Sequence, residues 1–185
     1  MFSLQRVQLR PSLATAGSPG HDKMKTVQGQ VSTFIDAPPE RVWHLISDIT
    51  RMGEWSPVCR RCEWLDGAAG PEVGARFRGH NRQGPMMWST VCEVTASEPG
   101  NVFEFRVIDG TFAFGHRGKE MTRWRYDFEA DGTGTRVSES YNIVAFPPML
   151  RPGSFFLKRQ DREGGMRTTL ERIRVAAEGP ETSSD

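Results

Sequence analysis

The chain has 185 residues, enough for one domain with a substantial hydrophobic core and too few for two comfortable ones. Its 24 Lys and Arg residues nearly balance 23 Asp and Glu residues, so the net charge of +1 argues against nucleic acid as a partner. Three cysteines are too few for a disulfide-stapled scaffold and no apolar run could cross a bilayer, so we expect a cytoplasmic protein without stable membrane insertion.

Both ends of the chain are polar. Residues 1–24 contain no apolar h-region of a secretory signal, and the chain closes on the polar stretch "EGPETSSD". We therefore expect a disordered leader at 1–24, one folded domain at 25–178 and a disordered tail at 179–185. A second methionine, Met24, precedes the first predicted strand, so a translation start at Met24 is an alternative to Met1.

The first predicted elements are a strand and two short helices. Residues 27–35 are rich in Val, Thr, Phe and Ile with a period of two, which predicts a strand that ends before Pro38 and Pro39. In "PPERVWHLISD" apolar side chains share one helical face, and Asp36 is the candidate N-cap. A second short helix is predicted in "ITRMGEWSP", where Pro57 stops it.

Six further strands and a long helix follow. Alternating apolar side chains between Gly, Pro, Asn and Asp turns predict strands at 60–66, 74–81, 86–96, 101–109, 120–130 and 135–146. The short turns predict antiparallel hairpins in a meander. Residues 155–178 carry an apolar stripe at helical spacing, which predicts a long amphipathic helix with Gly164 and Gly165 as weak points. The stripe consists of Met166, Leu170, Ile173 and Ala177.

This order predicts an α+β domain in which the last helix covers one face of the sheet. The chain resembles the START-like superfamily, also called Bet v 1-like or SRPBCC, in its bacterial polyketide cyclase/dehydrase branch, over residues 27–178. The resemblance rests on "VSTFIDAPPERVWHLISDITRMGEWSP", "GARFRGHN", "EVTASEPGNVFEFRV", "WRYDFEADGTGTRVSESY" and "GMRTTLERI". It implies a helix-grip fold: a seven-stranded antiparallel sheet wrapped around a long C-terminal helix, with two short helices between strands one and two closing a ligand cavity. Members include cyclases, lipid carriers, receptors and quinone-binding proteins, so function must be argued from the site.

Strand alternation predicts which side chains line the cavity. The expected ligand-binding residues are Phe77, Trp88, Thr90, Phe103, Phe105, Trp124 and Tyr126. In "RVSESYNI" a carboxylate, Glu139, falls on the same apolar face as Tyr141. Because an isolated charge is costly to bury, we expect Glu139 to have a partner or a raised pKa. In the functional interpretation Glu139 is a general acid/base or an anchor for a ligand hydroxyl, and Tyr141 beside it is a donor. Both are candidate catalytic or ligand-anchoring residues; the alternative is a structural glutamate held by backbone N–H groups or exposed at the cavity mouth.

Other reactive residue types favour structural roles. Cys59 and Cys62 form a lone C-x-x-C without a second ligand pair, so we interpret them as two unrelated thiols and expect no metal site. Trp55 is interpreted as a structural plug rather than a ligand-stacking residue. The histidines are interpreted as surface or loop residues: His44, His80 and His116.

The sequence therefore predicts a protein that binds a hydrophobic or aromatic small molecule, polyketide or lipid-like, in an internal cavity without a cofactor. Three versions are open. A polyketide cyclase or aromatase would use Glu139 and Tyr141 to move a proton on a folded ligand. A carrier would only bury its ligand, and an interaction protein would fill the cavity with its own aromatic side chains. We expect a monomer or a homodimer.

Overall fold

The computed structural model describes residues 27–110, 122–144 and 154–179, with side chains for 28–110, 122–144 and 162–179. The described residues form seven strands, three α-helices and one 3-10 turn. In chain order these are β1 (Val27–Ile35), α1 (Pro39–Ser47), η1 (Ile49–Arg51), α2 (Met52–Trp55), β2 (Cys59–Trp64), β3 (Arg76–Gln83), β4 (Met86–Glu98), β5 (Val102–Gly110), β6 (Thr122–Asp131), β7 (Gly134–Ile143) and α3 (Ser154–Glu178).

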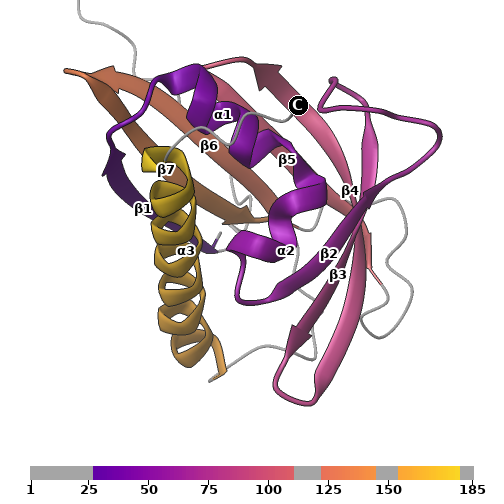
Figure 1. Ribbon diagram of the computed structural model, residues 1–185. Coiled ribbons are helices and arrows are strands. Elements are labelled where there is room, and N and C mark those ends of the chain that lie inside the picture. Colours follow the sequence, from indigo (N-terminus) through magenta and orange to yellow (C-terminus); the bar gives the residue numbers. More distant parts are fainter. Residues whose placement is uncertain (1–26, 111–121, 145–153, 180–185) are drawn as a thin grey trace, which may run out of the picture.

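All seven strands belong to one antiparallel sheet with the order β1-β7-β6-β5-β4-β3-β2. The predicted meander is confirmed from β2 to β7, and β1 closes the other edge by pairing with β7. The long helix α3 lies against β1, and α1 and α2 lie beside it in front of the sheet (Figure 1). This is the helix-grip fold that the resemblance implied.

Tight turns hold the meander together. Gly84 between β3 and β4 and Gly132 between β6 and β7 adopt φ values of 57° and 62°, in the left-handed region that glycine enters without steric cost. The turn at Gly132 sets the β6–β7 register, in which Tyr126 faces Glu139 and Trp124 faces Tyr141. The local turn chemistry therefore decides which side chains meet on the concave face of the sheet.

The two short helices differ from the prediction in how they are capped. Asp36 does not cap α1; its Oδ1 accepts a hydrogen bond from Thr133 Oγ1 at 3.0 Å, and no side chain caps this helix. The indole N–H of Trp43 donates to the carbonyl oxygen of Val102 at 3.0 Å and ties α1 to β5. Asp48 instead caps the 3-10 turn, because its Oδ1 accepts from the backbone N–H of Thr50.

The core lies between the concave face of the sheet and the helices. The predicted stripe of α3 is buried: Met166, Leu170, Ile173 and Ala177. The helix continues through Gly164 and Gly165, the predicted weak points.

Glu104, on the convex face, is also buried. Its carboxylate accepts a hydrogen bond from Thr95 Oγ1 at 2.7 Å and pairs with Arg125 at 3.3 Å, and these contacts offset the cost of burying its charge. Within the described residues, no helix is long and apolar enough to cross a membrane.

Candidate functional site

Aromatic side chains line the concave face of the sheet. Four of the expected ligand-binding residues are almost fully buried: Phe77, Phe103, Phe105 and Tyr126. The ring centroid of Phe105 lies 5.1 Å from that of Phe77 and 5.8 Å from that of Phe103. Since successive side chains of a strand point to opposite faces, β3, β5 and β6 each contribute alternate residues to this face. We call Phe77, Phe103 and Phe105 the aromatic wall.

The other three expected ligand-binding residues are half-buried: Trp88, Thr90 and Trp124. The ring centroid of Trp124 lies 5.5 Å from that of Tyr141. Thr90 Oγ1 is 3.9 Å from the sulfur of Cys92. Trp88 pairs with Asn81 near the β3–β4 turn, four residues along the strand from the pair of Cys92 and Phe77. The structure thus brings Trp124 and Tyr141 together and leaves Trp88 near the end of the hairpin.

Glu139 is the central polar residue of the concave face. It is 3% exposed, and burial raises the pKa of its carboxyl group to about 8, although the hydrogen bond from Tyr126 opposes this shift. The hydroxyl group of Tyr126 donates to Oε1 of Glu139 at 2.9 Å. Its other oxygen, Oε2, has no hydrogen-bond partner among the described residues. At neutral pH the carboxyl group is therefore mostly protonated and has one oxygen free to donate.

Tyr141 lies on the same face as Glu139 but does not donate a hydrogen bond to it. The two residues lie two positions apart on one strand, about 6.8 Å along its axis. The Tyr141 hydroxyl is buried and has no hydrogen-bond partner among the described residues. The register of the two strands explains this arrangement, because Tyr126 on β6 stands directly opposite Glu139 whereas Tyr141 stands opposite Trp124.

Three residues beside Tyr141 were not predicted. The guanidinium carbon of Arg162 lies 4.8 Å from the centroid of the Tyr141 ring. A Cβ atom on Gly29 would lie 2.7 Å from Tyr141 Cε1 and 2.9 Å from Glu163 Oε1, so the absence of a side chain in β1 makes room for both groups. Arg162 and Glu163 precede Met166 by four and three residues, so the helical repeat of the predicted stripe already places both on the same side of α3 as Met166.

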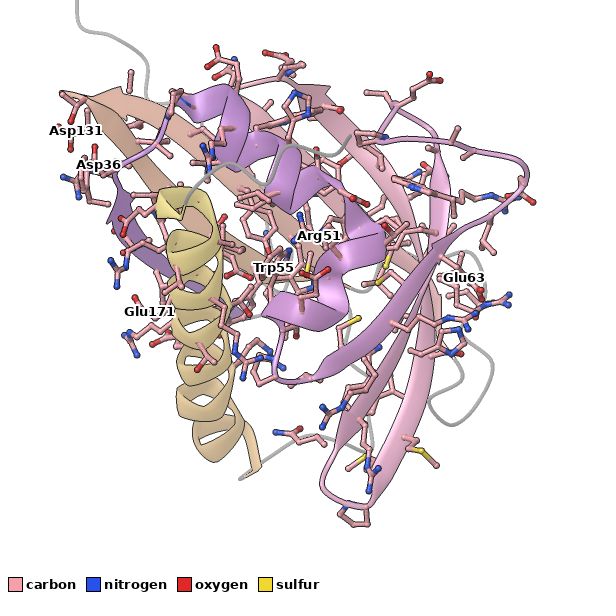
Figure 2. All side chains as sticks on the ribbon, in the orientation of Figure 1. Asp36, Arg51, Trp55, Glu63, Asp131 and Glu171 are labelled. Atoms are coloured by element: carbon pink, nitrogen blue, oxygen red, sulfur yellow. The ribbon has the colours of Figure 1, made fainter. Side chains whose placement is uncertain are left out.

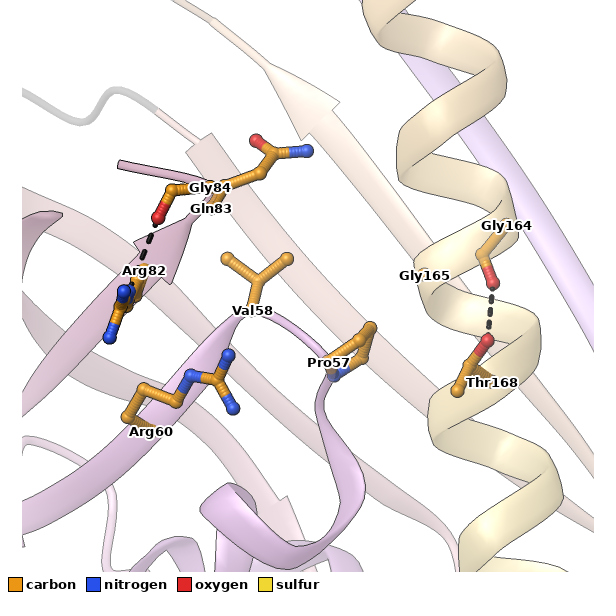
Figure 3. A pocket seen from close by; sticks show the side chains of 9 residues that line it. All are labelled: Pro57, Val58, Arg60, Arg82, Gln83, Gly84, Gly164, Gly165 and Thr168. Atoms are coloured by element: carbon orange, nitrogen blue, oxygen red, sulfur yellow. Dashed lines mark hydrogen bonds between the residues drawn. The ribbon is translucent and has the colours of Figure 1, made fainter. Parts of the chain in front are cut away.

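A hollow of about 450 Å³ opens between α3, the start of β2 and the β3–β4 turn (Figure 3). Gly164 and Gly165 face it without side chains, and a Cβ atom on Gly165 would lie 3.6 Å from Pro57 Cγ. Arg60 and Arg82 line the same hollow and give it two positively charged side chains, which the aromatic wall lacks. The volume lies within the range of small-molecule sites. The remaining lining residues are Val58, Gln83, Gly84 and Thr168.

Residues 26–178, which include every described element, match the family of polyketide cyclase / dehydrase and lipid transport proteins. The chain belongs to this family. Among curated protein sequences, none is significantly similar to the chain. The family description covers both an enzymatic and a transport activity, so the function of this member must be argued from its side chains.

Solved structures share the fold. Ginseng major latex-like protein 151 from Panax ginseng has a TM-score of 0.62 at 14% identity, over 82% of this chain and 97% of its own. Protein CV1439 from Chromobacterium violaceum has a TM-score of 0.60 at 15% identity, over 83% of this chain and 99% of its own. The Polyketide_cyc-like protein Cgl2372 from Corynebacterium glutamicum is 33% identical over 83% of this chain and 84% of its own, with a TM-score of 0.46.

The cysteines depart from the interpretation as unrelated thiols. The sulfur atoms of Cys59 and Cys62 lie 3.3 Å apart on the concave face, and Cys92 is buried as well. No group of His, Cys, Asp or Glu side chains within the described ranges could hold a metal ion. The polyketide cyclase/dehydrase and lipid transport fold of this chain thus contains a close dithiol that composition and spacing did not indicate.

Trp55 has a structural role, and the two described histidines lie at the surface. The indole N–H of Trp55 donates to the carbonyl oxygen of Leu45 at 3.2 Å, and the guanidinium carbon of Arg51 lies 4.8 Å from its ring (Figure 2). His44 is exposed, and His80 contacts the carboxylate of Glu63 at 3.2 Å. His116 lies outside the described residues.

Proposed function

We propose that this chain binds a hydrophobic or aromatic small molecule, polyketide-like or lipid-like, between the concave face of the sheet and α3. The observation that carries the proposal is the pair of buried polar atoms, Glu139 Oε2 and the Tyr141 hydroxyl, that have no partner among the described residues. Buried polar atoms of native proteins normally have a hydrogen-bond partner. A mostly apolar ligand that carries one or two oxygen atoms supplies such partners.

Each part of the concave face has a role in this proposal. Protonated Glu139 donates from Oε2 to a carbonyl or hydroxyl oxygen of the ligand, while Oε1 keeps its hydrogen bond from Tyr126. Tyr141 offers a second hydroxyl group. The aromatic wall, with Trp88, Thr90 and Trp124 at its margins, contacts the apolar body of the ligand.

An enzymatic version, a polyketide cyclase or aromatase, uses the same groups. A carboxyl group with a pKa of about 8 exchanges its proton near neutral pH, where general acid–base catalysis is effective. Glu139 would give this proton to a carbonyl oxygen of a ligand that the cavity holds in a folded shape. A carrier makes the same contacts and transfers no proton.

One observation favours a third candidate, an interaction protein with a filled cavity. The rings of the aromatic wall contact each other at centroid distances of 5.1 and 5.8 Å, so they occupy part of the space in front of the sheet themselves. In that case Glu139 would be a structural acid bonded to Tyr126, and no small molecule would enter.

The experiment is to extract small molecules from the purified protein and identify them by mass spectrometry, with binding of 8-anilinonaphthalene-1-sulfonate as a second readout. Glu139→Leu and Tyr141→Phe should each retain less of the co-purified molecule, because Leu has no donor at the position of Oε2 and Phe has no hydroxyl group. Glu139→Gln should retain the molecule, because its amide N–H can donate in place of the protonated carboxyl group. Glu104→Leu is the matched control, since Glu104 is a buried glutamate on the convex face.

The possible results separate the three versions. A molecule that fresh protein converts to a product identifies a cyclase, and a molecule recovered unchanged identifies a carrier. If the wild-type protein contained no co-purified molecule and did not bind the fluorescent probe, the proposal would be overturned and the filled cavity would be favoured. If Glu104→Leu and Glu139→Leu lost the molecule to the same extent, the effect would come from the fold rather than from the site.

A further inference from the structure

A bulge in β2 places two sulfur atoms on the same side of the sheet. In a regular strand, residues three positions apart point to opposite faces. Between Cys59 and Arg61 the pairing with β3 shifts, so that Cys59 stands opposite Asn81 and Cys62 opposite Gly79. Both cysteines are therefore buried, while Arg60 and Arg61 between them are exposed.

The same bulge shortens the distance between the two cysteines. Their backbones span only two residues of β3, about 6.8 Å, which is the upper end of the Cα separations of disulfides. The sulfur atoms are 3.3 Å apart, so a bond of about 2.0 Å requires them to approach by roughly 1.3 Å. Gly79 opposite Cys62 has no side chain, and its Cβ position is 3.6 Å from the Cys62 sulfur. The β3 residue opposite Cys62 therefore places no side chain in the way of the approach.

We propose that Cys59 and Cys62 are a redox-active dithiol that closes reversibly to a disulfide on the concave face of the sheet. The proposal does not depend on the small-molecule function, since it rests on the geometry of β2 and β3. It assigns a covalent modification site to the C-x-x-C motif.

The two thiols are chemically distinct. A hydrogen bond from the Cys62 thiol lowers the pKa of Cys59, whereas the same hydrogen bond and burial raise the pKa of Cys62. Cys59 is therefore the attacking thiolate. It attacks one sulfur of a low-molecular-weight disulfide and releases one thiol. Cys62 then loses its proton, attacks the Cys59 sulfur and releases the second thiol, so the protein loses two hydrogen atoms and the reagent gains them.

An oxidant reaches the buried Cys59 when β2 opens locally. Among the described strands β2 is an edge strand that pairs with β3 alone, so opening it breaks a single ladder together with its packing against η1 and α2. Val58 and Arg60, which flank Cys59 in the chain, line the hollow beside α3 (Figure 3). The guanidinium groups of Arg60 and Arg82 there favour an anionic reagent such as oxidised glutathione.

Cys92 provides an internal control. It lies on β4, inside the sheet, is 3% exposed, and burial raises the pKa of its thiol to about 12. Its thiol lies 3.9 Å from the hydroxyl group of Thr90. Cys92 should therefore remain a free thiol under conditions that oxidise the dithiol.

The test uses the folded full-length protein and oxidised glutathione. After alkylation of free thiols, trypsin cleaves after Arg60 and Arg61 and places the two cysteines on separate peptides, residues 52–60 and 62–76. We expect these two peptides to be recovered as one linked species that dithiothreitol separates, with Cys92 alkylated. Cys92→Ser should leave the linked species unchanged, and Cys59→Ser or Cys62→Ser should abolish it.

Three results would overturn the proposal. One is recovery of both peptides alkylated or carrying glutathione, without the linked species. Another is a linkage of either peptide to the peptide of Cys92. The third is a linkage that forms no faster in the folded protein than in urea-unfolded protein, because the proposal requires the fold to hold the sulfur atoms together.

Discussion

The hydroxyl group of Tyr126 donates a hydrogen bond to Oε1 of Glu139 at 2.9 Å, across the pair of strands β6 and β7. Both side chains are almost fully buried, so neither charge state of the pair is well solvated. Burial raises the pKa of Glu139 to about 8, and burial together with the charge of Glu139 raises the pKa of Tyr126 well above its ordinary value. The neutral form of both residues is therefore the stable one near neutral pH.

This pair predicts that stability falls as the pH rises. The unfolded Glu139 loses its proton near pH 4.5 and the folded one only near 8, so the native state binds more protons between these values. Its contribution is complete below pH 4.5 and is lost as the pH rises through about 8, with a slope of up to about 1.4 kcal/mol per pH unit. Urea denaturation across this interval measures it.

Two variants separate the contribution of Glu139 to the pH dependence of stability from the contributions of other titrating groups. Glu139→Gln cannot ionise and should lack this component, so the difference in free energy of unfolding from the wild type should change steadily with pH. Tyr141→Phe leaves Glu139 and its hydrogen bond in place and should keep the wild-type slope. Parallel curves for the wild type and Glu139→Gln would contradict the prediction.

The two tyrosines on the concave face should respond differently to loss of their hydroxyl groups. Tyr126→Phe removes the donor to buried Glu139 and should lower the free energy of unfolding by about 1–3 kcal/mol. Tyr141→Phe removes a buried hydroxyl without a partner among the described residues and should be neutral or stabilising in ligand-free protein. Chemical denaturation at neutral pH compares them, and the reverse order of stabilities would show that the hydrogen bonds are wrongly assigned.

Gly29→Ala should destabilise the protein and displace Tyr141. The added Cβ atom would lie 2.7 Å from Tyr141 Cε1 and 2.9 Å from Glu163 Oε1, so at least one side chain must move. Forced repacking of this kind costs about 1–3 kcal/mol. Gln30→Ala, at the neighbouring exposed position of β1, is the control and should change little. A variant as stable as the wild type would mean that the close approach is relieved without cost.

Gly164→Ala should stabilise the protein. Gly164 lies inside α3 and no atom lies within 4 Å of the position of an added Cβ atom. Replacing an exposed helical glycine by alanine contributes about 0.5–1 kcal/mol, mainly because the unfolded chain loses freedom. Thermal denaturation measures the effect, and a lower melting temperature would indicate that the helix is not regular at this position.

Much of the fold follows from local signals in the sequence. All six strands predicted after the short helices are present with ends shifted by a few residues, because period-two alternation and Gly-containing turns are local properties. Alternation was also sufficient to place Glu139 and Tyr141 on the buried face. These predictions required no knowledge of which strand lies beside which.

Partners across strands were harder to predict. The donor to Glu139 is Tyr126, and this pairing depends on the register of β6 against β7, which the alternation within each strand does not specify. The dithiol depends on a bulge in β2, and an alternating pattern contains no signal for the extra residue. The hollow beside α3 depends on packing between the glycines of the helix and Pro57, residues more than a hundred positions apart in the chain.

The pairing of β1 with β7 also has a consequence for how the chain folds. β1 is the first strand of the domain and β7 the last, so Val27 pairs with Ile143 only after nearly all the intervening chain has been synthesised. Contacts so distant in sequence slow folding, because a long loop must close before they form. Until then β1 has neither its neighbour in the sheet nor α3 against it, which makes this strand the segment of the nascent chain most in need of protection from aggregation.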